Sequence, residues 1–284
     1  MKKQIPVWVK KRVSFNESYK NTLSLINNLS INTVCVSAVC PNIYECFCKN
    51  YASFMILGNK CTRNCKFCGV DHTFPENCEI DTDEPFKILE AVKTLGMKYV
   101  VITSPTRDDL PDKGASQFAI VTKTLKEGIP SVKVEVLIPD FQGDKKYLEI
   151  VAKSQPDIIS HNIETIERLY SPIRPTSNFN TSISILKEIS NLGFIAKSGF
   201  MLGLGEKEDE IIELMHQIKD TECNYLIIGQ YLKPSKVAFK VEEYIHPDTF
   251  KKYEIIGKQI GFKNVFAGTF YRSSYLAEKL VINH

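Results

Sequence analysis

The sequence predicts an α/β fold, a partial (β/α)6 TIM-like barrel with N- and C-terminal extensions. Three observations predict it. From about residue 53, short apolar runs alternate with longer amphipathic runs six times, which implies parallel strands joined by right-handed crossovers. Polar and reactive residues follow these runs, at the strand ends where such folds place their sites. The chain has 284 residues, 43% of them hydrophobic, which is enough for one large core.

The expected strands are apolar and short: 53–57, 98–103, 132–138, 157–162, 193–201 and 224–230. The expected helices between them are amphipathic: 83–95, 115–126, 144–153, 165–170, 181–191 and 206–219. Asp83 and Asp144 are placed to cap two helix starts, and Gly96 and Gly128 stand where helices should end. Six such units also suit an open doubly wound sheet, so that architecture is the alternative.

The strand–helix alternation is lost before residue 50 and after residue 262. We therefore divide the chain into an N-terminal extension (1–50), a barrel (51–262) and a C-terminal tail (263–284). The first residues are basic, but Pro6 and Lys10 interrupt the apolar run that a secretory signal needs. We expect a cytoplasmic protein, with a short organellar transit segment as the alternative.

Composition excludes some classes of function. Lys and Arg total 36 against 33 for Asp and Glu, and a net charge of +3 does not predict a nucleic-acid partner. No apolar run approaches the roughly 18 residues that cross a bilayer, so we expect no membrane partner. Nine cysteines are an odd number for a disulfide framework, and seven of them lie within residues 35–68. Clustered thiols of this kind indicate a metal site or redox chemistry in a reducing compartment.

The stretch CTRNCKFC follows the first expected strand and contains Cys61, Cys65 and Cys68. Its C-x3-C-x2-C spacing supplies three thiolates, one fewer than closes a zinc or iron–sulfur site. A zinc knuckle completed by a remote ligand is one interpretation. The other is a [4Fe–4S] cluster on three cysteines, which leaves one iron open to a small chelating molecule. The position of the loop directly after a barrel strand favours the cluster.

A second triplet, Cys35, Cys40 and Cys46, has the spacing C-x4-C-x5-C. Buried thiols in an N-terminal cap would explain one such residue better than three. The remaining cysteines match neither motif, and we interpret them as ordinary thiols: Cys48, Cys78 and Cys223.

The first loop is similar to the signature of the radical S-adenosylmethionine superfamily, C-x3-C-x-aromatic-C, with Phe67 as the aromatic residue. This resemblance implies that the methionyl amine and carboxylate of S-adenosylmethionine chelate the open iron. One electron from the cluster would then cleave the sulfonium and give a 5′-deoxyadenosyl radical, which abstracts hydrogen from unactivated carbon.

The stretch TVCVSAVCPNIYEC closely resembles the auxiliary-cluster motif of the lipoyl synthase family. The resemblance runs from roughly residue 30 to 275 and includes YVVITSPTRDDL, HNIETIERLYSPIRP, KSGFMLGLGE, GQYLKPS and RSSY. It implies a second [4Fe–4S] cluster on Cys35, Cys40 and Cys46, with Ser274 as the fourth ligand. A serine oxygen is a harder and more basic ligand than a thiolate, so it can be released from its iron on protonation. This suits a cluster that is consumed as the sulfur source.

The resemblance also implies a reaction and its partners. A lipoyl synthase, a sulfurtransferase, inserts two sulfur atoms at C6 and C8 of an octanoyl chain amide-linked to a lysine. Two molecules of S-adenosylmethionine are consumed per product, and the auxiliary cluster gives up the sulfur. The implied partners are octanoylated lipoyl carrier domains, of a 2-oxoacid dehydrogenase E2 or of the glycine cleavage H protein. Reduced ferredoxin or flavodoxin would be the electron donor to a monomeric enzyme.

Two other functions are the alternatives. A methylthiotransferase, or another sulfur-inserting radical enzyme, would keep the chemistry and change the substrate. The lack of an appended nucleic-acid-binding domain and the presence of RSSY count against it. An iron–sulfur electron carrier without catalysis would need neither a barrel of about 200 residues nor an open iron.

Further contacts to the cofactor are expected at the strand ends: Phe67, Thr103, Ser104, Arg107, Asn162, Glu164, Lys197, Gly203 and Glu206. The stretch GLGE, from Gly203 to Glu206, would offer backbone donors to a methionyl or ribose group, or would simply start a helix. We interpret His161 as a satisfied structural residue. Departures from the family pattern affect no implied iron ligand; they are Val36, Ser37, Pro105, Thr106, Phe270 and Tyr271.

Overall fold

A computed structural model describes residues 5–11, 13, 15–75 and 80–281. Within these residues, seven strands form one parallel sheet whose order in space is the order in the chain. The strands are β1 (Ser53–Met55), β2 (Tyr99–Thr103), β3 (Lys133–Leu137), β4 (Ile158–Ser160), β5 (Ile195–Leu202), β6 (Tyr225–Gln230) and β7 (Asn264–Gly268). A doubly wound sheet would reverse its order at a switch point, so that alternative is wrong and the partial barrel is confirmed.

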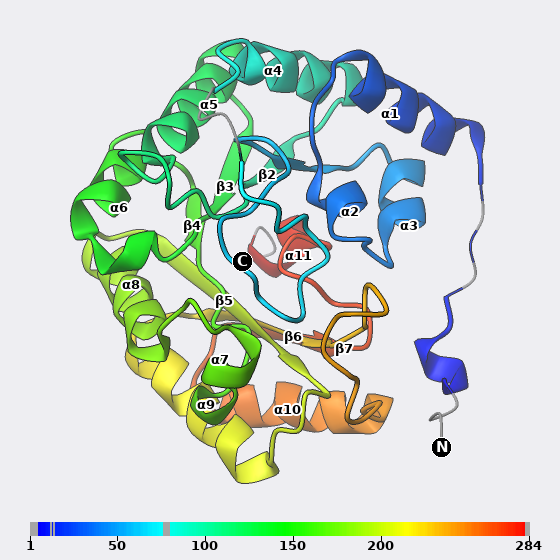
Figure 1. Ribbon diagram of the computed structural model, residues 1–284, viewed down its shortest axis with the longest axis vertical. Helices are drawn as coiled ribbons and strands as arrows, with labels where there is room; N and C mark the ends of the chain where they lie inside the picture. The colour runs from blue at the N-terminus through cyan, green and yellow to red at the C-terminus, as the bar shows by residue number, and fades with distance from the viewer. Residues whose placement is uncertain (1–4, 12, 14, 76–79, 282–284) are drawn as a thin grey trace.

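Helices form the outer layer, and the sheet curves around the interior (Figure 1). They are α4 (Glu84–Leu95), α5 (Ala115–Gly128), α6 (Lys145–Ala152), α7 (Glu167–Ile173), α8 (Phe179–Asn191), α9 (Glu208–Asp220) and α10 (Pro247–Ile260). Each main helix buries one apolar face against the strands, as Val121 and Leu125 of α5 illustrate. The core therefore lies between the helix layer and the sheet.

The six expected strands and the six expected helices are all present, but the strand count is not six. Asn264–Gly268, which the sequence analysis assigned to the tail, pairs with β6 as a seventh strand. The pattern hid it because β7 alternates buried with half-buried side chains and therefore lacks the fully buried run that marks β2 and β6. The bounds of the three regions of the chain stay predictions.

The predicted helix caps are correct in part. Asp144 accepts a hydrogen bond from the Lys146 amide at the start of α6, and Gly96 ends α4 in the left-handed region with φ 66°. Gly128 is the last residue of α5. Asp83 holds the cap position of α4 without a side-chain hydrogen bond, so its predicted capping role is wrong.

The N-terminal region contains η1 (Val7–Val9), α1 (Glu17–Asn28), α2 (Val34–Ser37) and α3 (Ile43–Cys48). Helix α1 continues the outer ring beside α4, whereas α2 and α3 lie at the opening between the two edges of the sheet (Figure 1). An isolated antiparallel bridge joins Thr33 to Phe54 of β1. Both cysteines of α2 and α3 that belong to the second triplet are therefore brought to the open side of the barrel.

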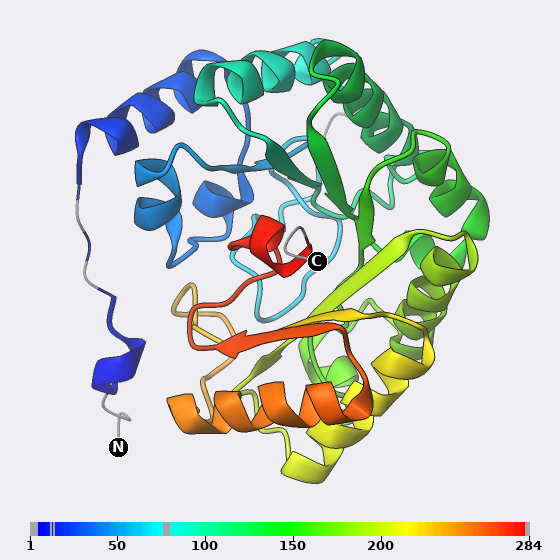
Figure 2. The ribbon, with the colours of Figure 1, turned by 180° about the vertical axis from the view of Figure 1, so that it is seen from behind.

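After β7 the chain turns inward, and α11 (Ala277–Val281) lies in the centre of the barrel (Figure 2). Ala277 packs there against Tyr99, Val101 and Ile158 of β2 and β4. Burial of these side chains removes apolar surface from water and fixes residues 269–281, the C-terminal segment, inside the sheet. No helix in the described parts of the chain is both long and apolar enough to cross a bilayer.

Candidate active site

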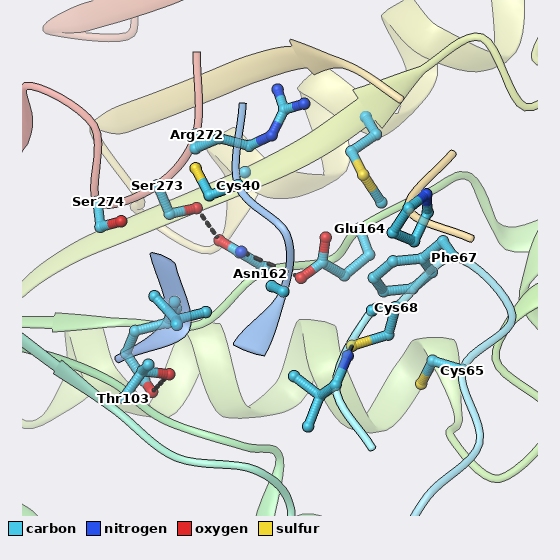
Figure 3. Close-up of a pocket in the computed structure, with 18 of the residues that line it drawn as sticks. Cys40, Cys65, Phe67, Cys68, Thr103, Asn162, Glu164, Arg272, Ser273 and Ser274 are labelled. Atoms are coloured by element: carbon cyan, nitrogen blue, oxygen red, sulfur yellow. Dashed lines mark hydrogen bonds between the residues drawn. The ribbon is translucent and has the colours of Figure 1, made fainter. Parts of the chain in front are cut away.

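A cavity of about 420 Å³ opens at the C-terminal edge of the sheet. It is the place where α/β barrels position reactive groups, because the loops after the strands converge there. Most of the site residues expected from the sequence line it: Cys35, Cys40, Cys61, Cys65, Phe67, Cys68, Thr103, Ser104, Asn162, Glu164 and Ser274 (Figure 3). The fold thus joins three distant parts of the chain around one space.

The loop of the first triplet is held by its backbone. The Thr62 amide donates to the Thr106 carbonyl at 2.9 Å, and the Lys66 amide donates to the Ile173 carbonyl at 2.8 Å. Two amides also donate to sulfur atoms at 3.4 Å, from Arg63 to Cys61 and from Val70 to Cys68. Such donors stabilise a thiolate ligand, so the loop is prepared to present three sulfurs to one space.

Burial, with a smaller contribution from the neighbouring Cys65 and Cys61, raises the pKa of the Cys68 thiol to about 12. Burial also raises the pKa of Cys65, opposed by the Arg174 guanidinium beside it. Cys68 is therefore protonated at neutral pH in the metal-free chain. Iron must displace that proton when it binds, because the thiolate is the ligand.

Arg63 fixes the same loop to two strand ends. Its guanidinium forms a fork with Asp140, with both Nη–Oδ distances at 2.6 Å, and a second fork with Asp108 at 2.7 and 3.1 Å. Burial alone would raise the pKa of Asp140, but the Arg63 hydrogen bonds and charge hold it at about 2. This contribution to stability is complete above the ordinary pKa of 3.8 and is lost as the pH falls through about 2.

Replacement of Arg63 by Gln should destabilise the metal-free protein by about 3–5 kcal/mol, because it leaves a buried carboxylate without its partner. Urea unfolding at neutral pH would measure the loss. Lys133→Gln is the matched control, since it breaks an ion pair with Asp157 in which the lysine is 57% exposed. That change should cost about 0–1 kcal/mol. Equal losses in the two variants would contradict a special role for the Arg63 forks.

The second triplet lies in α2, the following turn and α3. Burial raises the pKa of Cys35 to about 12, with Cys40 as the next cause. Burial likewise raises the pKa of Cys46, and both Cys35 and Cys40 add to the increase. The three thiols are therefore electrostatic neighbours. Cys46 lines a second cavity of about 270 Å³, together with Tyr51 and Tyr275.

The geometry of the thiols bears on the kind of metal group. Among the described residues, no three His, Cys, Asp or Glu side chains converge on a site for one ion. Thiolates that share one zinc ion lie about 3.8 Å apart, as tetrahedral geometry with a Zn–S bond of about 2.3 Å requires. Thiolates around a four-iron cluster bind separate irons and stand farther apart.

The C-terminal segment closes the cavity beside Cys40 (Figure 3). The Ser273 hydroxyl donates to Asn162 Oδ1 at 2.7 Å, and Asn162 Nδ2 donates to Glu164 Oε1 at 3.0 Å. The Ser274 carbonyl accepts from the Tyr51 hydroxyl at 3.2 Å. The segment therefore joins the predicted cofactor contacts in the loop after β4 to the region of the second triplet.

Two further hydrogen bonds join the chain ends. Asn42 Nδ2 donates to the Phe270 carbonyl at 2.7 Å, and the Tyr275 hydroxyl donates to the Glu45 carboxylate at 3.0 Å. Asn42 and Glu45 flank the turn between Cys40 and Cys46. Ser274 thus lines the same cavity as Cys35 and Cys40, and its carbonyl meets Tyr51 across 223 positions of the chain.

Four predicted cofactor contacts do not line the cavity, and Arg107 and Lys197 are two of them. Arg107 is buried and pairs with Asp109 at 2.7 Å, and it also donates to the Leu57 carbonyl at 3.1 Å. Lys197 is fully buried against Glu135 and donates to the Ser273 carbonyl at 2.8 Å. Protein acceptors hold both cations in the structure, and their assignment as cofactor contacts stays a prediction.

The other two are Gly203 and Glu206. The Glu206 carboxylate accepts from the amides of Gly203, Leu204 and Gly205 at 3.0–3.2 Å, so the backbone donors expected to meet the cofactor are already used. Gly203 has φ +101°, and a Cβ there would come within 2.3 Å of Gln230. The GLGE stretch therefore forms a packed loop before α9, and its contact with the cofactor stays a prediction.

Two polar residues of the cavity wall were not predicted as contacts. His161 donates from Nδ1 to the Ile138 carbonyl at 2.9 Å, and burial lowers its pKa to about 4, so the ring is neutral. Its Nε2 has no hydrogen-bond partner, which corrects its interpretation as satisfied. Arg174 donates to Tyr170 at 2.6 Å, while its Nε is unpartnered. The position of His161 directly after a strand was the one sequence feature that could have indicated its place in the cavity wall.

The two other cysteines that the structure describes, Cys48 and Cys223, lie outside the lining of both cavities. Cys223 is buried in the core, 3.4 Å from the Ala196 carbonyl, which fits an ordinary thiol. Cys48 lines neither cavity. Cys78 lies outside the described residues.

Known proteins are similar to this chain over most of its length. The sequence model of the radical SAM superfamily matches residues 55–218. A lipoyl synthase of Caldicellulosiruptor saccharolyticus is 47% identical over 98% of each chain, and one of Aquifex aeolicus is 48% identical over 89% of this chain and 92% of its own. A third, of Caldanaerobacter subterraneus, is 46% identical over 96% and 95%.

Solved structures are similar at the level of the fold. Streptococcus suis SuiB bound to S-adenosylmethionine has a TM-score of 0.61 at 18% identity, over 83% of this chain and 56% of that chain. HydG, a maturase of the [FeFe]-hydrogenase, has a TM-score of 0.59 at 16% identity, over 93% and 71%. These likenesses support the partial barrel.

Proposed function

Because this chain belongs to the lipoyl synthase family of the radical SAM superfamily, we propose that its two cysteine triplets divide one sulfur-insertion reaction between them. The enzyme inserts two sulfur atoms, at C6 and C8 of a protein-bound octanoyl-lysine, and it uses S-adenosylmethionine and a [4Fe–4S] cluster. We assign that cluster to Cys61, Cys65 and Cys68. The single observation that carries the proposal is that the first triplet, two cysteines of the second triplet (Cys35 and Cys40) and Ser274 line one cavity, while Cys46 lines a second one.

The residues of the chain have separate tasks in this proposal. When bound, the cluster and S-adenosylmethionine supply a carbon radical that abstracts hydrogen. Asn162 and Glu164 line the cavity. The Glu164 carboxylate can accept from the ammonium group of the cofactor, and the Asn162 amide can accept from or donate to a hydroxyl group. Phe67, Thr103 and Ser104 complete that side of the wall. The neutral His161 Nε2 can accept one further hydrogen bond from a bound molecule.

The second cluster is assigned to Cys35, Cys40, Cys46 and Ser274, and it would donate the sulfur. The charge and burial of the thiols fit this role, since a cluster replaces the protons that burial retains on Cys35 and Cys46. Tyr51 and Asn42 tie the C-terminal segment to this region. The serine oxygen binds iron less firmly than a thiolate, which favours release of the cluster during turnover.

An octanoyl chain fits the wall opposite the polar contacts. Met55, Leu137, Ile138 and Ile227 line the cavity with apolar side chains, and they would exclude water from an alkyl chain. The carrier domain would stay outside and deliver the chain through the cavity mouth. Binding energy from that domain can then position C6 and C8 for hydrogen abstraction.

A protein-bound octanoyl group should therefore be turned over much faster than free octanoate, by about two orders of magnitude, since remote binding energy is lost with the carrier. An octanoyl-lysyl carrier domain, an octanoyl-lysyl peptide and free octanoate would be compared under anaerobic, single-turnover conditions. Lipoyl product is measured by mass spectrometry. Comparable rates for the free acid and the peptide would contradict a carrier-bound substrate.

The finer identity of the partners belongs to the same proposal. We assign the carrier to a lipoyl domain of a 2-oxoacid dehydrogenase E2 or to the glycine cleavage H protein. The electron donor would be reduced ferredoxin or flavodoxin, and the enzyme would act as a monomer in the cytoplasm. Seven cysteines within residues 35–68 support a reducing compartment, because an oxidising one would convert them to disulfides before iron binds.

Two simpler experiments separate this function from the alternatives. Release of 5′-deoxyadenosine from S-adenosylmethionine by the reduced protein distinguishes an enzyme from an electron carrier. Formation of lipoyl-lysine, in place of a methylthiolated product, distinguishes it from a methylthiotransferase. The family membership over nearly the full chain favours lipoyl-lysine.

A further inference from the structure

We propose that Lys197 is a positioning residue: held by Glu135, its ammonium fixes the Ser273 carbonyl and thereby orients Ser274 toward the auxiliary cluster. The inference rests on the proposed function, in which Ser274 is a ligand of that cluster. Lys197 lies on β5 and Glu135 on β3, both in the barrel interior and both 0% exposed. Neither residue lines the cavity.

The ammonium of Lys197 has three donors, and each has an acceptor. The Glu135 oxygens lie at 2.6 and 2.7 Å and the Ser273 carbonyl at 2.8 Å. Glu135 also accepts from the Tyr99 hydroxyl at 2.5 Å and from the Ser160 hydroxyl at 2.6 Å. The charge pair is therefore complete only when the C-terminal segment is in place.

A buried ion pair is a poor source of stability. Desolvation of two charges offsets most of their attraction, and apolar residues of similar volume often do as well or better. The buried pair is better explained by the conformation that it selects for the C-terminal segment. Removal of the segment would leave one buried N–H of Lys197 without a partner, so the pair favours a single position for the Ser273 carbonyl.

The floor under the segment is made of glycines, which is an independent observation. A Cβ on Gly229 of β6 would come within 2.4 Å of the Tyr271 carbonyl oxygen and 2.9 Å of the Arg272 guanidinium. A Cβ on Gly199 of β5 would lie 3.2 Å from the Ser273 hydroxyl. The absence of side chains at these two positions lets the backbone of the segment approach the sheet closely enough for Lys197 to reach it.

Ser274 is held from both sides by contacts that do not use its hydroxyl. The Ser273 carbonyl belongs to the planar peptide that leads into Ser274, and Lys197 fixes it. The Ser274 carbonyl itself accepts from Tyr51. These two contacts define the backbone on either side of the Ser274 Cα, and the side chain remains available to the cavity that Cys35 and Cys40 line.

The test uses the double variant Lys197→Met/Glu135→Gln, which removes both charges, keeps similar volumes and retains a polar partner for Tyr99 and Ser160. Amide hydrogen exchange of residues 272–281 in the metal-free protein is the first readout. We expect exchange there to be about tenfold faster than in the unmodified protein, because a hydrogen bond from a charged group is lost. After iron loading, the variant should still cleave S-adenosylmethionine, but it should lose auxiliary-cluster iron to a chelator about tenfold faster.

The matched control is Arg107→Met/Asp109→Asn, a change to another buried ion pair that makes no described hydrogen bond to the C-terminal segment. Exchange of residues 272–281 should keep its normal rate in this control. Gly229→Ala is a second variant, which leaves the charge pair intact and displaces the segment from the sheet. It should reproduce the faster exchange and the loss of iron, and it decides the matter if the double variant does not fold.

Unchanged exchange of residues 272–281 in the double variant would overturn the role of Lys197. Unchanged exchange in Gly229→Ala would overturn the close approach of the segment to the sheet, on which that role depends. A failure of the proposed function has a different signature. A Ser274→Ala protein that retained auxiliary iron and sulfur insertion would overturn the ligand assignment, and with it this inference, whatever the exchange rates show.

Discussion

Replacement of Cys61, Cys65 and Cys68 by alanine should abolish cleavage of S-adenosylmethionine and remove one cluster. The anaerobically loaded protein should hold about eight irons, as two four-iron clusters, and the triple variant about four. The physical reason is that these thiolates alone hold the cluster whose fourth iron the cofactor needs. Iron analysis, absorbance spectra and 5′-deoxyadenosine release measure the effect.

Replacement of Cys35, Cys40 and Cys46 should have the complementary effect. The protein should again hold about four irons, but cleavage of S-adenosylmethionine should continue, because the loop of the first triplet has its own contacts to the ends of β2 and α7. Sulfur insertion should fall to background. The two triple variants are matched controls for each other, since each removes three thiols.

Lipoyl product from the second triple variant would contradict the sulfur-donor role of that cluster. Loss of cofactor cleavage from the same variant would contradict the division of the reaction between two independent sites. Cys223 provides a further check, because it is a buried thiol outside both sites. Cys223→Ser should leave the iron content near eight, although a buried hydroxyl will lower stability.

Ser274→Cys should give a well-formed auxiliary cluster that donates sulfur poorly, with insertion reduced by about tenfold or more. A fourth thiolate binds iron more firmly than an alkoxide and is less readily released on protonation. Ser274→Ala should instead leave an iron open to water and a less durable cluster. Spectroscopy of the cluster, its lifetime in chelator and single-turnover lipoyl formation separate the two outcomes.

Ser273→Ala is the matched control for the Ser274 variants. It removes a neighbouring hydroxyl that donates to Asn162, but it keeps the carbonyl that Lys197 fixes. It should affect cofactor binding more than retention of auxiliary iron. Unchanged sulfur insertion in Ser274→Cys would remove the serine from the mechanism.

The order of the barrel strands could be predicted because it follows from local patterns. Buried parallel strands are near-continuous apolar runs, as β2 and β6 are, and the helices between them repeat their apolar residues at helical spacing. Strand β7 escaped prediction because only two of its five side chains are buried, so it lacks the fully buried pattern of β2 and β6. Its assignment depends on pairing with β6, a contact that no local pattern records.

The candidate site divides in the same way. The two cysteine spacings and Ser274 were visible in the sequence as motifs, and the structure brings Cys35, Cys40 and Ser274 to the cavity that Cys61–Cys68 also lines. Arg107 and Lys197 were assigned to the cofactor because a cation at a strand end commonly faces a ligand. Their acceptors, Asp109 and Glu135, are visible only in three dimensions.

The sequence by itself determined the chemistry of this protein: which thiols can bind iron, and which loops carry them. These properties depend on residue type and short spacing, which a linear chain contains in full. Only the tertiary structure decided how the C-terminal segment reaches the second triplet, since Ser274 meets Tyr51 across 223 positions of the chain. That contact requires the turn after β7, the absence of side chains at Gly199 and Gly229, and the buried ammonium of Lys197. These features come together only when the strands that carry them have paired in the sheet.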